Sequence, residues 1–257
     1  MTTVSPTISR GRISEAQFFV FMAITCALLA FGGFAITYWA PLALGTFRGA
    51  PVVHLHGLLF SAWVLFFALQ ASMIASGQRV RHRALGLFGI ALATAMVFVG
   101  TWTALHSLRA GVAAGYEAGA RAFATVPLTG IAFFAVVVGF AIANVKRPET
   151  HMRLMLLATI SILQAAAGRI TRAIFAPDSP APGQGPPPPL AVTYPAAILV
   201  DLLLLAAIIY DWRTRGRPHP VYLIGGAVLL LMQFTHSLVA ESGVWNAALD
   251  ALLRLAG

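Results

Sequence analysis

Residues 52–77 read VVHLHGLLFSAWVLFFALQASMIASG, and this stretch decides the fold class. It contains no Asp, Glu, Lys or Arg, and it is longer than the ~20 apolar residues that cross the hydrocarbon core of a bilayer. Similar runs recur at short intervals, and no polar stretch between them is large enough for a soluble domain. The sequence therefore predicts an all-α polytopic membrane helical bundle that forms one membrane domain.

The composition agrees with a membrane environment. Hydrophobic residues make up 59% of the 257 residues and charged residues only 10%, whereas soluble domains carry about 25% charged residues. The net charge of +9 would suggest nucleic-acid binding in a soluble protein, but here the Arg residues form short blocks between apolar runs. We therefore expect the lipid bilayer as partner and no nucleic acid. The single cysteine, Cys26, excludes an intramolecular disulfide and a Cys-based metal cluster.

Seven transmembrane helices are predicted. The expected spans are 17–40, 52–77, 82–108, 121–144, 150–175, 194–212 and 221–240. A cytoplasmic N-terminal segment (1–16) precedes the transmembrane domain (17–240), and a short amphipathic tail (241–257) follows it on the outer side. The connection at 176–190 is rich in proline and cannot continue a helix, so we expect a flexible flap or spacer there.

The basic residues give the bundle an orientation, because loops rich in Lys and Arg stay in the cytoplasm. With the N-terminus inside, eleven of the seventeen Lys and Arg residues fall on the inner side and six on the outer. The inner group is Arg10, Arg12, Arg79, Arg81, Arg83, Lys146, Arg147, Arg153, Arg213, Arg215 and Arg217, and the outer group is Arg48, Arg109, Arg121, Arg169, Arg172 and Arg254. We expect a multi-pass protein of the bacterial inner (cytoplasmic) membrane with its C-terminus outside.

Ionisable side chains within spans are costly in lipid and mark candidate functional positions. The orientation sorts the histidines into an outer and an inner group. The outer group is His54, His56, His106 and His236, and the inner group is His82, His151 and His219. Glu241 and Arg172 also fall near the outer side. Asp201 falls near mid-bilayer, where a carboxylate needs a partner, and we expect that partner to be Arg169. His219, between two prolines, is expected at the surface of an inner loop.

Residues seven and fourteen apart share one face of a helix. His56, Trp63 and Gln70 have this spacing and predict a polar-tipped stripe along the second span. Interhelical hydrogen bonding with aromatic packing explains the stripe as well as a ligand site does.

Short motifs run through the second to fifth spans. They are His56, Gln70, Arg79, Arg81, the run His82-Arg83-Ala84-Leu85-Gly86, the run His151-Met152-Arg153-Leu154-Met155, and Arg169. These motifs resemble a family of uncharacterised bacterial multi-pass membrane proteins that is distantly similar to haem-binding cytochrome b and oxidase-assembly membrane proteins. The resemblance covers roughly the middle half of the chain and implies no particular reaction. It implies key positions at His56, Gln70, His82, Arg83, His151 and Arg169.

A first hypothesis is redox chemistry on haem b held between histidine pairs. The expected pairs are His56 with His106 or His236 on the outer side, and His82 with His151 on the inner side. Arg169 would neutralise a propionate, and a quinone or a redox protein would be the electron partner. The fourth span contains no histidine, whereas di-haem membrane cytochromes take axial histidines from four consecutive spans.

Two further hypotheses remain. In one, zinc or copper binds near the outer face in a membrane hydrolase or metal-handling protein, with ligands drawn from several helices. The candidate ligands are His54, His56, His106 and His236, with Asp201 or Glu241 as a ligand or base. In the other, no cofactor is bound, and Asp201, Arg169 and the histidines line the path of a small transporter, a proton relay or an assembly factor. The outer cluster is the expected site.

Overall fold

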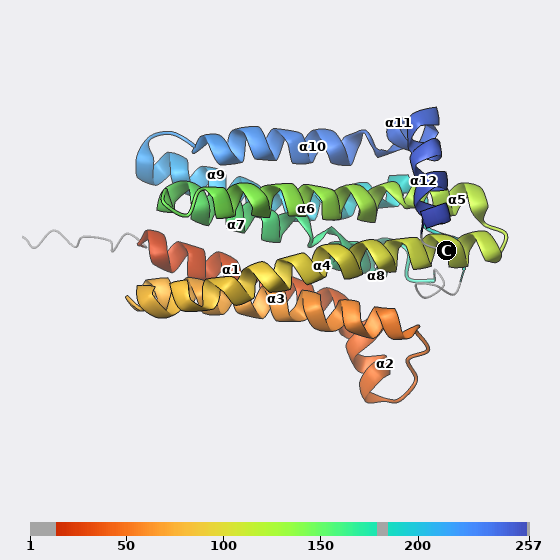
Figure 1. The fold of residues 1–257 in the computed structure, drawn as a ribbon, viewed down its shortest axis with the longest axis horizontal. Coiled ribbons are helices and arrows are strands. Elements are labelled where there is room, and N and C mark those ends of the chain that lie inside the picture. Colours follow the sequence, from red (N-terminus) through yellow and green to blue (C-terminus); the bar gives the residue numbers. More distant parts are fainter. Residues whose placement is uncertain (1–13, 179–184, 256–257) are drawn as a thin grey trace, which may run out of the picture.

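The computed structural model describes residues 14–178 and 185–255. Within these ranges every regular element is helical, and the long helices run side by side along one axis (Figure 1), so the all-α prediction is confirmed. The helices are α1 (Glu15–Phe34), α2 (Ala40–Ala43), α3 (Pro51–Ala75), α4 (Arg79–Ala113), α5 (Glu117–Phe123), α6 (Thr125–Ala143), α7 (Pro148–Ser161), α8 (Gln164–Phe175), α9 (Tyr194–Arg215), α10 (Gly226–Phe234), α11 (His236–Glu241) and α12 (Gly243–Leu255). Three short segments complete them: η1 (Ala35–Trp39) and η3 (Val221–Gly225) are π-helical, and η2 (Leu190–Thr193) is a 3-10 turn.

Several helices are long and apolar enough to cross a membrane. Five stretches meet this criterion alone: Glu15–Ala43, Pro51–Ala75, Arg79–Ala113, Glu117–Ala143 and Leu190–Arg215. α7 and α8 make a sixth if they count as one span, with a bend of 41° between them. The expected seventh span is not one continuous helix, because the apolar stretch Val221–Phe234 is short and α11 follows as a separate helix.

The long helices form a closed ring around an apolar core. α1 packs on α3, α3 on α4, α4 on α6 and α6 on α7, and α1 closes the ring against α7 and α8. Met22, Trp63, Met96 and Phe134 fill the middle of the bundle and are almost fully buried. α9 packs against α7 and α8 from outside the ring and also contacts α10.

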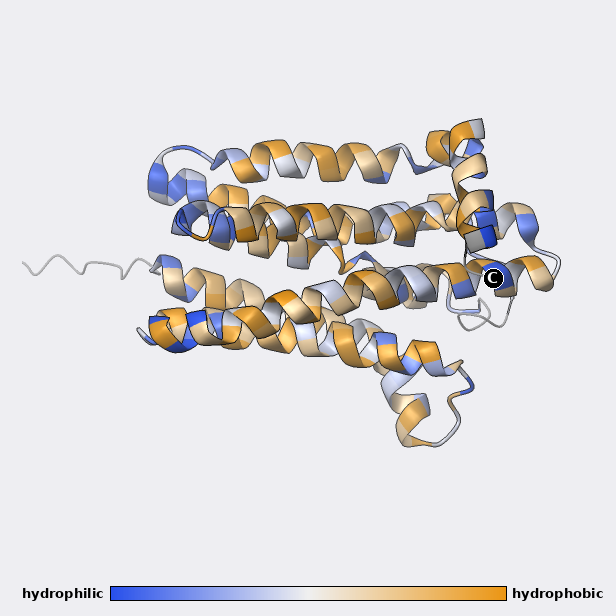
Figure 2. Ribbon diagram, in the orientation of Figure 1, coloured by the Kyte–Doolittle hydropathy of each residue, from blue (hydrophilic) through white to orange (hydrophobic). Residues whose placement is uncertain are grey.

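The outer surface of the bundle is apolar. Large side chains such as Leu28, Phe98 and Phe140 are 69%, 71% and 60% exposed. Figure 2 shows hydrophobic residues along the middle of the helices and hydrophilic residues at their two ends. Contiguous exposed apolar surface of this kind is unfavourable in water but matches a hydrocarbon environment. The chain is accordingly a membrane protein.

Two local features shape the helices next to the candidate sites. A capping box of Ser14 and Gln17 begins α1, satisfying backbone N–H groups at its start. At the other end of α1, Gly33 lies so close to Ala166 of α8 that an added β-carbon would collide with the Ala166 carbonyl. The backbone then continues as the π-helix η1. Short π-helical turns occur frequently at functional sites.

The two ends of the bundle differ in charge. We call one the basic end; it contains the start of α1 and the connections at 76–78, 144–147 and 216–220, with Arg79, Lys146, Arg147 and Arg217. The other we call the opposite end; it contains α2, α5, α11 and the predicted amphipathic tail, which forms α12 (Figure 1). Arg121 pairs with Asp250 at 2.9 Å and fastens α12 to α5. Residues 179–184 of the expected flap and residues 1–13, with Arg10 and Arg12, lie outside the described residues.

Candidate functional site

A pair of histidines lies at the basic end. The rings of His82, in the first turn of α4, and His151, in the first turn of α7, have centroids 6.4 Å apart and are T-shaped. Nδ1 of His151 lies 2.9 Å from the carbonyl oxygen of Ala141. Because a carbonyl can only accept, Nδ1 carries the proton and Nε2 keeps its lone pair. Nδ1 of His82 is buried without a hydrogen-bond partner within the described residues.

The predicted stripe on α3 connects this pair with the middle of the bundle. Gln70 is buried, its backbone lies against His82, and its Oε1 has no hydrogen-bond partner in the described part of the chain. Seven residues before Gln70 on the same face, Trp63 is 1% exposed and donates from Nε1 to the Thr159 hydroxyl at 3.2 Å. Its ring packs edge-on against Phe134. The stripe therefore runs through the core of the bundle.

At the opposite end, the stripe finishes beside a half-buried arginine. His56 stacks on Phe60 with ring centroids 4.0 Å apart and lies within electrostatic range of the Arg169 guanidinium. Nε of Arg169 donates to the Thr37 hydroxyl at 3.0 Å, and its guanidinium lies 4.1 Å from the ring centre of Phe34. Gly33, next to Phe34 in the chain, is also where α1 and α8 approach each other closely.

The other expected residues of the opposite end do not converge on His56. His106 is exposed, and His54 pairs with the Tyr38 hydroxyl at 3.1 Å. His236 is buried, with Nε2 3.1 Å from the Thr129 hydroxyl. Glu241 lines a separate surface pocket between α5, α11 and α12.

The expected partnership of Asp201 and Arg169 is wrong. Asp201 accepts from Gln233 at 3.4 Å, whereas Arg169 contacts α1. The two side chains therefore have different partners on different helices. Within residues 14–178 and 185–255, no group of three or more His, Cys, Asp or Glu side chains is placed to hold a metal ion. The outer site formed by several histidines is therefore not assembled.

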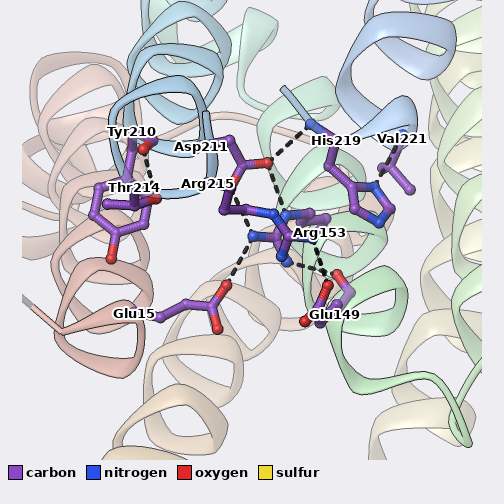
Figure 3. Close-up of polar contacts among 9 residues, drawn as sticks. All are labelled: Glu15, Glu149, Arg153, Tyr210, Asp211, Thr214, Arg215, His219 and Val221. Atoms are coloured by element: carbon purple, nitrogen blue, oxygen red, sulfur yellow. Dashed lines mark hydrogen bonds and ion pairs between the residues drawn. The ribbon is translucent and has the colours of Figure 1, made fainter. Parts of the chain in front are cut away.

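Arg153 forms a buried ionic network that we did not anticipate (Figure 3). We expected Arg153 among the basic residues on the inner side, but its side chain is fully buried. Its guanidinium makes a two-bond contact with Asp211, at 2.9 Å from Nε and 2.6 Å from Nη2. Nη2 also meets Glu15 at 2.7 Å, and Nη1 donates to the Glu149 carbonyl. The network ties α1, α7 and α9 together.

His219 belongs to the edge of this network and is half-buried, so its expected place at the surface of a loop needs correction. Its backbone N–H donates to Asp211 at 3.1 Å, and its Nδ1 accepts from the Val221 N–H at 3.2 Å. Burial, followed by the positive charges of Arg153 and Arg215, lowers the pKa of the His219 imidazole below its usual value of 6.5. The neutral ring is thus the form that the fold favours.

No family model, curated protein or solved structure matches this chain. His56 and Gln70 are fourteen residues apart on one helix, which corresponds to about 21 Å at 1.5 Å per residue. A histidine pair at one end and a histidine with an arginine at the other form two separate sites, with Trp63 between them.

Proposed function

We propose that this chain is a membrane redox protein that binds one haem b between His82 and His151. The observation that carries the proposal is the 6.4 Å separation of the two imidazole rings. This separation fits two rings that bind the same metal ion. Two metal–nitrogen bonds of about 2 Å each, together with the distance from each nitrogen to its ring centre, place the two ring centroids roughly 6 Å apart. Zinc or copper held by protein alone would require at least three ligands, whereas haem iron needs two at most.

The surroundings of the pair suit two histidines that would hold a haem iron. The hydrogen bond from His151 Nδ1 to the Ala141 carbonyl fixes the ring and leaves Nε2 available, as is usual for metal-bound histidines. Nδ1 of His82 and Oε1 of Gln70 are buried polar atoms that lack partners in the described residues, as expected beside a group that completes the site. Arg79 and Arg83, exposed in the same turns of α4 as His82, are suited to bind propionates. A bound haem would supply one-electron transfer.

We further propose the full topology of seven spans in the bacterial inner membrane. α7 and α8 then act as one bent span, and η3, α10 and α11 together form the seventh. The N-terminus lies in the cytoplasm, because the basic end carries most of the Lys and Arg residues. This orientation places the His82–His151 pair on the cytoplasmic side, with a quinone or a redox protein as electron partner.

The test is an absorption spectrum of detergent-purified protein from haem-supplemented cells. We expect a Soret band and α-bands in the wild type, and we expect His82→Ala and His151→Ala each to abolish them or shift them strongly. His106→Ala, at an exposed position on the same helix as His82, is the matched control and should leave the spectrum unchanged. Wild-type protein without a Soret band, or bands that persist in both variants, would refute the proposal. Metal analysis of the same sample tests for zinc and copper.

A further inference from the structure

At the opposite end of the bundle, the described residues give the Arg169 guanidinium no counter-charge. All eight Asp and Glu residues of the chain lie within the described ranges, and none of them is within ion-pairing distance of Arg169 there. A half-buried guanidinium that lacks an anion is unfavourable, because part of its hydration is lost without compensation. The fold therefore holds Arg169 at a cost to stability.

Neighbouring groups hold Arg169 in place without neutralising it. Nε donates to Thr37, Nη1 donates to the Ala165 carbonyl at 2.8 Å, and the Phe34 ring covers one face. A guanidinium has five N–H donors in a planar fork, so these two bonds leave donors available. Nη2 makes no hydrogen bond to any of the described residues. The side chain is thus positioned while part of its binding capacity remains unused.

The groups around the guanidinium add to its attraction for an anion. The charge of Arg172, one turn further along α8, acts on Arg169 electrostatically. His56 lies within range on α3, and its buried Nδ1 has no partner among the described residues. When protonated, this nitrogen can donate a hydrogen bond. Three nitrogen-bearing side chains from two helices are therefore brought together here, and Arg169 pairs with no carboxylate of the described residues.

We propose that Arg169, with Thr37 and His56, forms a binding site for an oxyanion, either a carboxylate or a phosphate. The planar fork of arginine matches two oxygens of such a group, and this geometry distinguishes it from a simple positive charge. The anion comes from one of two sources, a soluble compound or the headgroup of an anionic lipid. His56 lies about 21 Å along α3 from Gln70, whose backbone lies against His82, so the propionates of a haem bound at the His82–His151 pair are not the ligand of this site.

The experiment uses full-length, haem-free protein in a neutral detergent, so its outcome is independent of haem binding. Thermal stability is measured against increasing inorganic phosphate or succinate in one arm, and against increasing phosphatidylglycerol in the other. A ligand that binds the folded state raises the melting temperature. We expect stabilisation in at least one arm: an effect of phosphate or succinate identifies a soluble anion, and an effect of phosphatidylglycerol alone identifies a lipid.

Variants distinguish binding by the planar guanidinium of Arg169 from general attraction by positive charge. Arg169→Gln should weaken the effective ligand at least tenfold and, without ligand, melt no lower than the wild type, because an uncompensated charge has been removed. Arg169→Lys keeps the charge but loses the fork, and it should also weaken binding about tenfold. Arg48→Gln, at an exposed position near the same end, should bind like the wild type.

Three results would overturn the proposal. The first is the absence of stabilisation of the wild type in both arms. The second is an equal loss of binding in Arg48→Gln, which would indicate general charge attraction. The third is an Arg169→Lys variant that binds the ligand as tightly as the wild type. This result would show that the planar guanidinium is not needed for binding, even if Arg169→Gln failed to fold.

Discussion

Substitution of Asp211 by Asn tests the buried network at the basic end. The Arg153 and Asp211 side chains are 0% and 2% exposed, and their contact consists of two short hydrogen bonds (Figure 3). Asp211→Asn keeps the shape of the side chain but removes the principal counter-charge. Glu15 cannot replace it, because Glu15 is 43% exposed and meets only Nη2.

The expected loss of stability is large. Removal of one partner of a buried ion pair costs about 3–5 kcal/mol, because the remaining charge is left without compensation. For a domain of about 150–250 residues, each kcal/mol corresponds to about 2–4 °C in melting temperature. Asp211→Asn should therefore lower the melting temperature by roughly 6–20 °C. Circular dichroism of the detergent-purified protein during heating measures this melting temperature.

Two comparisons make this prediction specific. Glu149→Gln removes the contact with Arg215, in which the side chains are 58% and 30% exposed, and such surface pairs contribute about 1 kcal/mol or less. The double variant Arg153→Met/Asp211→Leu removes both charges and should regain most of the loss. A shift in Asp211→Asn as small as that in Glu149→Gln would refute the reasoning, and so would a double variant no more stable than the single one.

Two other predictions follow from local geometry. His219 has a lowered pKa in the folded state, so its contribution to stability is complete above the usual pKa of 6.5 and is lost as the pH falls below that value. The melting temperature between about pH 8 and about pH 5 should therefore fall less steeply in His219→Gln than in the wild type, and an identical slope would contradict the assignment. Gly33→Ala should destabilise the protein by about 1–3 kcal/mol, because its new methyl group meets the Ala166 backbone. Gly32→Ala, where a β-carbon meets nothing within 4 Å, is the matched control in a thermal melt and should be neutral or slightly stabilising.

The helical fold was predictable because lipid leaves few alternatives. A segment in hydrocarbon must satisfy its backbone polar groups internally, so long apolar runs become helices. The shared face of His56, Trp63 and Gln70 was predictable for a similar reason, since it depends only on the period of one helix. Breaks inside spans were harder: the bend between α7 and α8 falls at Ile162 and Leu163, where the sequence has neither Pro nor Gly.

The lateral arrangement of side chains was not predictable. Position along a span gives depth, but the neighbours of a side chain depend on how each helix is rotated and which helices are adjacent. His106 is exposed, while Asp201 meets Gln233 instead of Arg169. Arg153 illustrates the same limit, because a cation near the end of a span is indistinguishable in sequence from one that anchors to lipid.

The Arg153 network also constrains the order in which the chain is assembled. Its two acidic partners lie 138 residues before and 58 residues after Arg153. During synthesis, α7 is made well before Asp211, so the guanidinium must wait for its principal counter-ion. The contact with Asp211 can form only once α9 has been made, and it then joins helices from the first, middle and later parts of the chain.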